Sequence, residues 1–509
     1  MERPYAQVAE THSAVVFFAG DRAYKVKKPV SLGFLDFSAP RARAVACARE
    51  VELNRRFAPD VYLGVAEVRG PDGRVCEHLV VMRRMPPSRR LSALVQAQAP
   101  VADAVGQVAR ILAAQHASAP RGPQIAEQGS ADALRRRWAD NVEQIRRLPG
   151  ELLDPAAVTE MERLAGQFIA GRRPLLRARV SGGRIVDGHG DLLAGDIFCL
   201  DDGPRILDCL EFDDRLRWLD GLDDAACLAM DLEHLGDRRL AEQFIGWYTE
   251  YSGDRAPRSL RHHYIAYRAV VRAKVACVRA GQGAPEAAAD ARRLAGIALG
   301  HLREGAVALV LIGGLPGTGK SALADALASR LGGVVLSSDR IRKELAGLPP
   351  AQQPAVPYGA GIYSPAATEA TYAELLRRAA GLLAGGELVI ADASWASAEH
   401  RAAAIAVARE AHARLVQLRC SAPADLAEQR ISGRPPGPSD ADRGIARQMA
   451  AAMAPWPEAA TIDTRRGDRG GAGDRDGVPA DLVDQAVAAI RPPQRAPAGQ
   501  PSRPYMPPG

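Results

Sequence analysis

The chain has 509 residues, a length that implies two or three domains at roughly 100–200 residues each. Its hydrophobic content, 47%, is that of a folded soluble protein, no apolar run reaches the ~18 residues that a membrane span needs, and no secretory signal is visible. The seven scattered cysteines form no CxxC pair, which favours a reduced, cytoplasmic protein. The formal net charge is +6, but acidic and basic residues are interspersed, so we expect neither a membrane nor a nucleic-acid partner.

Lysine is rare in this chain, because arginine supplies all but six of the 66 basic residues. A lysine that persists can mark a position that requires a compact ammonium in place of a planar guanidinium. Three of the six fall at residues 25–28, and another, Lys320, follows a glycine-rich run. These two segments are therefore candidates for function.

In chain order, the first 85 residues predict two hairpins separated by a helix over residues 40–57. Strands over 14–18 and 22–30 form the first hairpin, and strands over 61–68 and 74–85 form the second. Short apolar strands around turns are expected at 184–212. Helices are expected near 101–117, 131–147, 155–171, 222–250, 258–280 and 286–302.

The remaining sequence predicts a different fold class. A β-rich apolar run at 306–312 indicates a buried parallel strand, and helices alternate with further strands from there to about residue 490. We therefore expect a first domain over 1–302, a linker at 301–305, an α/β domain over 303–492 with a parallel sheet, and a disordered Pro-rich tail over 493–509. Within the second domain, strands are expected at 334–337, 388–391 and 414–419, a mobile segment at 465–477 and a helix at 479–490.

A complete GxxxxGK[ST] motif follows the first strand of the second domain and opens a helix, which is the context that a phosphate-binding loop requires. Its glycines allow backbone N–H groups to approach phosphate oxygens, the lysine reaches the β- and γ-phosphates, and the serine binds Mg²⁺. The alternative, a glycine-rich turn with a chance lysine, is disfavoured by the flanking strand and helix. The motif residues expected to contact ATP are Gly314, Gly317, Thr318, Gly319, Lys320 and Ser321.

Downstream residues suggest the rest of this site. Asp392 ends an apolar strand, as a metal-binding carboxylate of Walker B type does. Asp339 follows another strand and could accept a proton from a hydroxyl, with Arg342 holding a substrate anion, although capping of a helix by Ser338 or Asp339 explains that segment equally well. Arg430 and Arg434 could close over the phosphates as a lid, or simply face solvent.

These motifs resemble the small P-loop kinases that include gluconate kinase, chloramphenicol phosphotransferase and zeta-toxin-like enzymes. The resemblance covers about residues 306–462 and rests on GGLPGTGKS, SSDRIRKEL, VIADASW and LRCSAPADLAEQRISGR. It implies that Asp339 activates the substrate and that Arg430 and Arg434 belong to a lid. Since that group of enzymes phosphorylates hydroxyls of varied small molecules, the acceptor does not carry over.

The first domain contains His189-Gly190-Asp191-Leu192, followed by Asp196 and Asp208, all in a strand-rich region. One loop carboxylate can take a proton from a hydroxyl while two others hold Mg²⁺ against ATP phosphates. Ordinary turn chemistry is the alternative, because Asp and Gly favour turns. The complete spacing, HGDLxxxD with another Asp twelve residues later, is more specific than HGD alone.

This pattern resembles the aminoglycoside phosphotransferase-like branch of the protein-kinase-like fold, over roughly residues 12–250. The resemblance implies a bilobal α+β domain with Asp191 as catalytic base and with Asp208 and Asp196 as metal ligands. Asp196 replaces the Asn that many relatives have, and no Gly-rich loop occurs. The resemblance also requires a strand lysine paired with a helix glutamate, for which Lys25 and then Lys27, and Glu50 and then Glu52, are the candidates.

The predicted function is an ATP- and Mg²⁺-dependent phosphotransferase for a small-molecule hydroxyl, with an ATP site in each domain and an undetermined oligomeric state. The alternative is a regulatory protein in which the first domain senses a nucleotide or metabolite and the P-loop domain acts as an ATP-driven switch. Two further groups are expected to be structural. His262 and His263 should pack on or within a helix, and Asp223, Asp224 and Asp231 should be cap and surface residues.

Overall fold

The computed structural model describes residues 6–10, 14–30, 36–148, 152–349, 352, 359–433, 443–465 and 478–491. The chain divides into two compact units, unit 1 (Met1–Gly305) and unit 2 (Ala306–Gly509). Helix α11 (Ala287–Glu304) runs through the expected linker and buries His301 and Leu302, so that segment finishes a helix of unit 1. Except for Arg465, the expected mobile segment and the whole expected tail lie outside the described residues.

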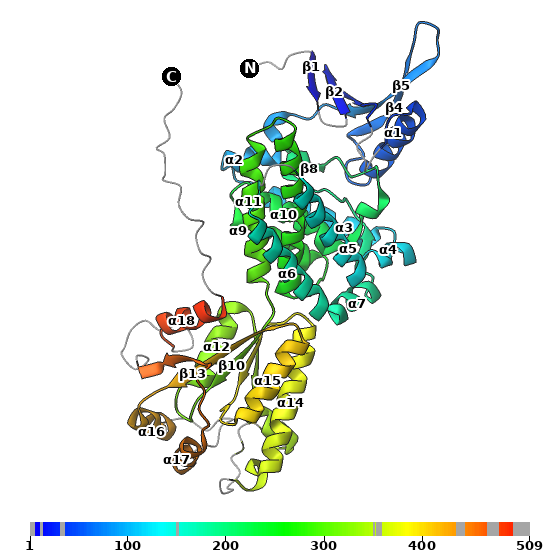
Figure 1. Ribbon diagram of the computed structural model, residues 1–509. Coiled ribbons are helices and arrows are strands. Elements are labelled where there is room, and N and C mark those ends of the chain that lie inside the picture. The colour runs from blue at the N-terminus through cyan, green and yellow to red at the C-terminus, as the bar shows by residue number, and fades with distance from the viewer. Residues whose placement is uncertain are drawn as a thin grey trace, which may run out of the picture. The chain divides into compact units, whose positions relative to one another are not determined.

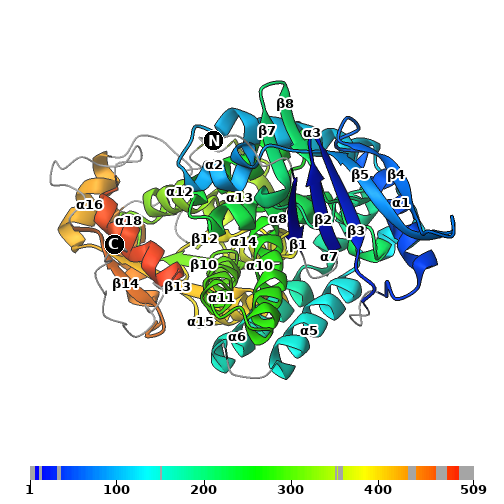
Figure 2. The same cartoon turned by 90° about the horizontal axis from the view of Figure 1, so that it is seen from above.

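Unit 1 begins with a five-stranded antiparallel sheet in the order β1-β2-β3-β5-β4. Figure 2 shows these strands side by side with the helix α1 next to β4 and β5. Both predicted hairpins and the helix between them are confirmed, whereas β1, which pairs with β2, was not predicted. The elements are β1 (Ala6–Glu10), β2 (Ala14–Ala19), β3 (Arg22–Lys27), α1 (Pro40–Asn54), β4 (Tyr62–Arg69) and β5 (Val75–Arg83).

Apolar side chains fix α1 against this sheet. Cys47 and Val51 of α1 are buried together with Tyr62 of β4 and Val80 of β5. Because side chains alternate across a strand, the residues of β3 that share the covered face are Ala23, Lys25 and Lys27. The helix therefore brings Glu50, which lies between Cys47 and Val51, to the face that carries both lysines.

The rest of unit 1 is mostly helical (Figure 1), with two short antiparallel strand pairs, β6 with β9 and β7 with β8. The helical segment expected over 222–250 consists of two helices, because Gly236 at φ +102° ends the first. The elements are α2 (Leu91–Gln96), α3 (Ala102–Ser118), α4 (Pro123–Glu127), α5 (Ala131–Arg147), α6 (Pro155–Gly171), α7 (Arg173–Ser181), β6 (Ile185–Asp187), β7 (Ile197–Leu200), β8 (Gly203–Ile206), β9 (Trp218–Asp220), α8 (Gly221–His234), α9 (Arg238–Tyr251) and α10 (Arg258–Gly281).

Unit 2 is an α/β fold around a five-stranded parallel sheet in the order β11-β12-β10-β13-β14. Its strands are β10 (Ala308–Gly313), β11 (Val334–Ser337), β12 (Val389–Asp392), β13 (Arg414–Ser421) and β14 (Ala460–Asp463). The predicted strands are confirmed, and β14 is an addition. The first strand, β10, lies in the centre with later strands on both sides, which makes its carboxyl end the switch point where ligands bind in such sheets.

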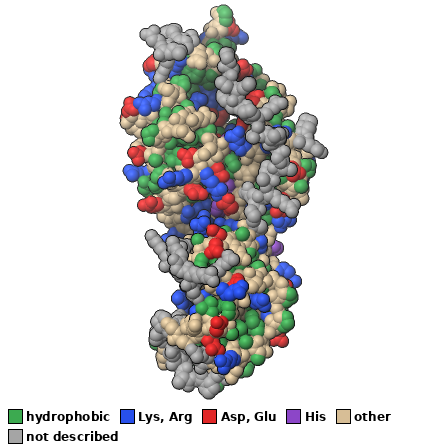
Figure 3. All heavy atoms as spheres, turned by 90° about the vertical axis from the view of Figure 1, so that its left-hand side faces the viewer, with side chains coloured by type: hydrophobic (Ala, Val, Ile, Leu, Met, Phe, Trp, Pro, Cys, Tyr) green, Lys and Arg blue, Asp and Glu red, His purple; other side chains and the backbone are tan. Residues whose placement is uncertain are grey.

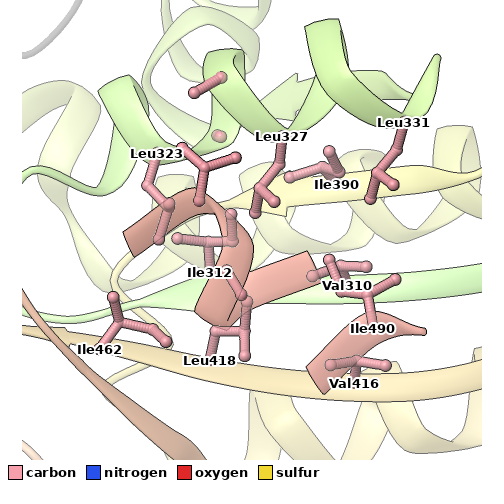
Figure 4. Packing of buried hydrophobic residues seen from close by; sticks show 14 of the residues in the cluster. Val310, Ile312, Leu323, Leu327, Leu331, Ile390, Val416, Leu418, Ile462 and Ile490 are labelled. Atoms are coloured by element: carbon pink, nitrogen blue, oxygen red, sulfur yellow. The ribbon is translucent and has the colours of Figure 1, made fainter. Parts of the chain in front are cut away.

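Helices cover both faces of this sheet (Figure 1). On one face, leucines of α12 pack with residues of α18 against Val310 and Ile312 of β10 (Figure 4). The other face carries α14 and α15, so every residue of β10 is buried, as in a doubly covered parallel strand. The helices are α12 (Lys320–Leu331), α13 (Ser338–Leu345), α14 (Pro365–Ala384), α15 (Ala398–Glu410), α16 (Ala424–Gly433), α17 (Arg443–Ala452) and α18 (Ala480–Ile490).

The surface agrees with the charge pattern of the sequence. Figure 3 shows basic and acidic side chains scattered among one another on the face turned to the viewer. Within the described part of the chain, no helix combines the length and the apolarity that a bilayer span requires.

Two neighbouring histidines of α10 are buried, which confirms that they are packing residues. His262 Nδ1 lies 2.8 Å from His301 Nδ1. His263 stacks on Phe168 with ring centroids 4.3 Å apart, and its Nε2 accepts a hydrogen bond from Trp138 Nε1. Burial lowers the pKa of His263 to about 3, with a further contribution from Arg137.

This depressed pKa predicts an acid-sensitive contribution to the stability of unit 1. A histidine in the unfolded chain has a pKa near 6.5. Between about pH 6.5 and 3, His263 is therefore protonated in the unfolded chain and neutral in the folded one. Stability is therefore lost as the pH falls through this window, by about 1.4 kcal/mol per pH unit. We expect His263→Gln to be less stable than wild type at pH 7, with the difference shrinking by pH 5 in urea unfolding followed by circular dichroism. A constant difference across this range would contradict the assignment.

Candidate functional site

In unit 2, residues 314–319 join the carboxyl end of β10 to α12. Three glycines of this loop have positive φ angles, +132° at Gly314, +77° at Gly317 and +82° at Gly319. A Cβ at Gly314 would lie 2.5 Å from the Cys420 carbonyl oxygen, and one at Gly317 would lie 2.4 Å from the Ala427 carbonyl oxygen. The loop conformation therefore requires glycine at both positions.

The polar residues of the motif gather at the start of α12. Lys320 Nζ donates to the Leu315 carbonyl at 2.9 Å, and the Thr318 hydroxyl donates to the same oxygen at 2.7 Å. Ser321 Oγ donates to Asp392 Oδ2 at 2.6 Å, which unites the motif with the carboxylate that ends β12. Burial raises the pKa of Asp392, while Lys320 and the bond from Ser321 oppose the rise.

Asp339 lies at the same edge of the sheet. The last residue of β11, Ser337, is in register with Asp392, and Asp339 follows in the first turn of α13. Its negative charge contributes to the raised pKa of Asp392, so the two carboxylates are near each other. The cap position of α13 belongs to Ser337 and has no side-chain hydrogen bond, so the alternative in which Ser338 or Asp339 caps this helix is wrong.

The arginines expected around this site have different surroundings. Arg342 is buried, and its Nη1 donates to the Ile362 carbonyl and the Thr368 hydroxyl at 2.8 and 3.1 Å, so it braces α13. Arg430 donates from Nη2 to the Thr464 carbonyl at 2.9 Å and from Nη1 to the Thr464 hydroxyl at 3.2 Å. That hydroxyl donates to the Thr318 carbonyl at 3.0 Å, so Arg430 connects α16 to the phosphate loop. Arg434 lies outside the described residues.

In unit 1, one buried glutamate is shared by two lysines. Glu50 has no exposed side-chain surface, and its two oxygens lie 2.9 Å from Lys25 Nζ and 2.6 Å from Lys27 Nζ. Burial alone would raise the pKa of Glu50, but the two ammonium groups outweigh it and the pKa is lowered. Glu52 is exposed and pairs with Arg49, so Glu50 is the helix glutamate that meets the strand lysines.

Both lysines also reach the segment after β8. Lys25 Nζ lies 2.6 Å from Asp208 Oδ1, and Lys27 forms a second ion pair with Glu211. Asp208 has φ +64°, which is uncommon for a residue with a Cβ, and its N–H donates to the Tyr62 hydroxyl at 3.1 Å. The Asp208 side chain is 49% exposed, and Lys25 lowers its pKa to about 2 against a smaller opposing effect of desolvation. Sequence reasoning missed Glu211, although an acid close after Asp208 is visible in DCLEF.

The other two expected acids lie close enough to Asp208 to influence one another. Burial raises the pKa of Asp196 to about 8, with repulsion from Asp208 and Asp191 adding to the rise. Among the described residues, no group of three or more carboxylates, histidines or cysteines is arranged to hold an ion by itself. A cation between these acids would therefore need further oxygens, such as those of a nucleotide's phosphates.

The carboxylate of Asp191 is partly exposed. Its side chain is 39% exposed, and Oδ2 lies 3.3 Å from Arg272 Nη1 of α10. Cys227 Sγ lies 3.9 Å from the other oxygen. The carboxylate is thus positioned by its loop and open to an incoming group.

The backbone of this loop is held by a buried carboxylate that was wrongly expected at the surface. Asp224 is completely buried, and its oxygens accept the N–H groups of His189 and Gly190 at 2.6 and 2.9 Å. His116 Nε2 lies 3.0 Å from the same carboxylate. Burial would raise the pKa of Asp224, but the hydrogen bond and charge of His116, with His189 and Arg268, outweigh it and lower the pKa below its ordinary range.

The neighbouring acids of α8 were also misassigned. Asp223 is buried and bonds Arg268 Nε at 2.7 Å, while the carboxylate of Asp231 accepts the Ala194 N–H at 2.8 Å. The cap of α8 is Asp220. The sequence did offer one sign that α10 contacts the loop of Asp191, namely two arginines four residues apart on the predicted helix, Arg268 and Arg272.

Comparisons with known proteins agree with this division into two units. Residues 309–456 match a family model described as an AAA domain (AAA_33). An uncharacterised protein of Mycobacterium tuberculosis is 46% identical over 463 residues, which span 91% of this chain and 93% of the relative. The chain belongs to the family of that protein. Unit 1 has the predicted α+β fold, and unit 2, which contains the residues matched by the family model, has the predicted parallel α/β fold around the P-loop.

Two solved structures are similar to part of the chain. A choline/ethanolamine kinase family protein from Mesorhizobium loti is 14% identical and covers 58% of this chain and 92% of its own, with a TM-score of 0.37. A gluconokinase from Sinorhizobium meliloti is 16% identical and covers 36% of this chain and 91% of its own, with a TM-score of 0.25.

The glycine geometry of unit 2 gives a direct test. We expect Gly317→Ala to weaken binding of MgATP to unit 2 by at least about tenfold, because the strained φ and the contact with the Ala427 carbonyl force the loop to move. Gly347→Ala is the matched control, since Gly347 has φ +67° but no atom within 4 Å of its Cβ position. Binding is measured by calorimetry in a Lys25→Ala background. Equal affinities in the two alanine variants would contradict the expected cradle.

Proposed function

We propose that the protein is an ATP-dependent phosphotransferase that acts on a hydroxyl of a small molecule, with an ATP site in each unit. The bond from Ser321 Oγ to Asp392 Oδ2, 2.6 Å long, carries this proposal for unit 2. It brings a hydroxyl and a carboxylate together at the start of α12, directly after the glycine loop. Lys320 and the loop would hold the phosphates, and Asp339 at the same sheet edge would orient the acceptor hydroxyl.

The residues present fit a nucleotide with Mg²⁺. Hydroxyl and carboxylate oxygens are the ligands that this hard cation prefers, and Ser321 and Asp392 supply them in unit 2. The positive φ angles at Gly314, Gly317 and Gly319 give the loop a conformation in which its backbone N–H groups could turn toward phosphate oxygens. Bound Mg²⁺ would neutralise charge that develops on the phosphates.

Unit 1 offers a second set of groups for the same reaction. We assign Lys25 to the ATP phosphates, because it is the more exposed lysine, 13% against 2% for Lys27, and already contacts Asp208. Asp208 and Asp196 would hold Mg²⁺. Asp191, open and without a strong partner, would accept the proton of the acceptor hydroxyl.

A regulatory role for unit 1 is the competing proposal. The observation that favours it is the surplus of acid around Lys25, because Asp196 adds a carboxyl where the resemblance leads one to expect an amide. In that case unit 1 would bind a nucleotide or metabolite without turnover, and the P-loop unit would act as an ATP-driven switch.

The two proposals differ in ADP formation over a panel of small-molecule hydroxyl acceptors. We expect Lys320→Ala to lower the turnover by unit 2, and Asp191→Asn the turnover by unit 1, each by about 100-fold or more, since each removes a group that acts on the reacting atoms. Each substitution should spare the other activity. Nucleotide binding to unit 1 without ADP formation from any acceptor would instead support the regulatory role.

The two lysines of β3 should separate into a phosphate ligand and a structural residue. We expect Lys25→Ala to lower kcat/KM for ATP by about 100-fold with a small change in melting temperature, because Glu50 keeps Lys27. Lys27→Ala leaves buried Glu211 without its ammonium and should cost about 3 kcal/mol of stability. Thermal melts and ATP titrations of both variants measure this. The reverse assignment would follow if Lys25→Ala were the less stable variant with an intact kcat/KM for ATP.

A further inference from the structure

Helix α10 directs two arginines, one helical turn apart, at the loop that carries Asp191. Arg268 is buried, with its Nη1 donating to the Gly190 carbonyl and its Nε to the Asp223 carboxylate, both at 2.7 Å. Arg272 is 30% exposed and donates one hydrogen bond, from Nη1 to Asp191 Oδ2 at 3.3 Å. Among the described residues, its remaining N–H groups meet no hydrogen-bond acceptor.

Arg272 differs in exposure and in hydrogen bonding from an arginine of this protein that forms purely structural ion pairs. A structural pair is seen at Arg179, which is 7% exposed and gives four hydrogen bonds of 2.5–2.7 Å to Asp220 and Asp254. Such short, bidentate, buried contacts hold a guanidinium in one place. The single long contact of Arg272 leaves most of its donor fork available to a ligand beside Asp191.

The charges around Arg272 indicate what kind of group it would bind. Burial alone would lower the pKa of Arg272, but Asp191, Asp231 and Asp196 raise it, so the guanidinium stays charged. Without this cation, the acids beside the acceptor hydroxyl would repel the phosphate group that must approach it. A guanidinium is also the group that matches two phosphoryl oxygens at once.

We propose that Arg272 is a catalytic residue of unit 1 that binds the γ-phosphoryl group during its transfer; this rests on the proposed function. The acceptor oxygen forms a bond to the γ-phosphorus, the bond from that phosphorus to the β–γ bridging oxygen breaks, and ADP leaves. The proton of the acceptor hydroxyl passes to Asp191. Arg272 offsets the negative charge on the equatorial oxygens of the moving group, as arginines do in other phosphoryl transfers.

The test uses the full chain with the substitution Lys320→Ala, which removes the P-loop lysine of unit 2. Binding of MgADP is measured with and without aluminium fluoride, an ion that mimics the transferring phosphoryl group. Binding that is lost on adding Lys25→Ala is assigned to unit 1. We expect aluminium fluoride to tighten MgADP binding and Arg272→Gln to remove about tenfold or more of that tightening. The affinity for MgADP alone should change less than about twofold, since no transferring group is then present.

Two further variants make the result specific. Arg272→Lys keeps the charge without the planar fork and should retain part of the tightening. Arg279→Gln removes the same charge from an exposed position of α10 and should behave like the Lys320→Ala parent. Melting temperatures establish that each variant is folded.

The outcomes separate this inference from the function on which it rests. If unit 1 does not bind MgADP in the parent, the phosphotransferase proposal for unit 1 fails, and the role of Arg272 with it. If MgADP binds but aluminium fluoride tightens binding equally in the parent and in Arg272→Gln, or in neither, Arg272 is not a phosphoryl ligand while the nucleotide site stands.

Discussion

Unit 1 depends on a carboxylate that water does not reach, that of Glu50. Removing an ionised carboxylate from water costs several kcal/mol unless opposite charges and hydrogen bonds replace the solvent. Lys25 and Lys27 provide that replacement from adjacent positions on one face of β3. Since Glu50 would be left uncompensated without an ammonium group beside it, and Lys27 is the more buried of the two lysines, the pairing fixes α1 against the sheet more specifically than apolar contacts alone.

The same pairing connects the sheet to the acidic segment after β8. Each lysine has a second partner there, Lys25 with Asp208 and Lys27 with Glu211. Two positive charges thus face three negative ones, and Asp196 and Asp191 stand nearby. This imbalance is tolerable in a half-open region but favours any cation that enters with a nucleotide. The persistence of lysine at positions 25 and 27 has a physical reason, because a compact ammonium fits between two carboxylates where a guanidinium fork is larger.

Local patterns in the sequence were sufficient wherever one segment determines its own structure. The hairpins at residues 14–30 and 61–85 and the strand-loop-helix around Lys320 were predicted because their turns and periodicity are local. The edge strands β1 and β14 were not, since their sequences, AQVAE and ATID, contain no continuous apolar run such as VVL in β11, and pairing with a neighbour defines them.

The buried acids near the candidate site of unit 1 also could not be predicted from local sequence patterns. Asp223 and Asp224 stand in the first turn of α8, where acids usually interact with the helix dipole, and nothing local distinguishes that use from the observed one. The partners of Asp224 include Gly190 and His116, 34 and 108 residues earlier in the chain, and Asp223 pairs with Arg268, 45 residues later. Long-range hydrogen bonding of this kind leaves no periodic trace in a single sequence. The spacing of Asp191, Asp196 and Asp208 is recognisable because the three acids lie within one strand-rich stretch.

The acid at position 196 departs less from the expected amide than its formal charge suggests. Burial and the nearby carboxylates raise the pKa of Asp196 to about 8, which favours the protonated carboxyl. That form has one donor and one acceptor oxygen, much as an amide has a donor nitrogen and an acceptor oxygen. The rise comes from burial and from Asp208 and Asp191, and Lys25 and Arg90 already oppose it. A cation would reverse the balance and turn the same side chain into an anionic ligand. The substitution therefore makes the charge of this position depend on what occupies the site, which an amide cannot do.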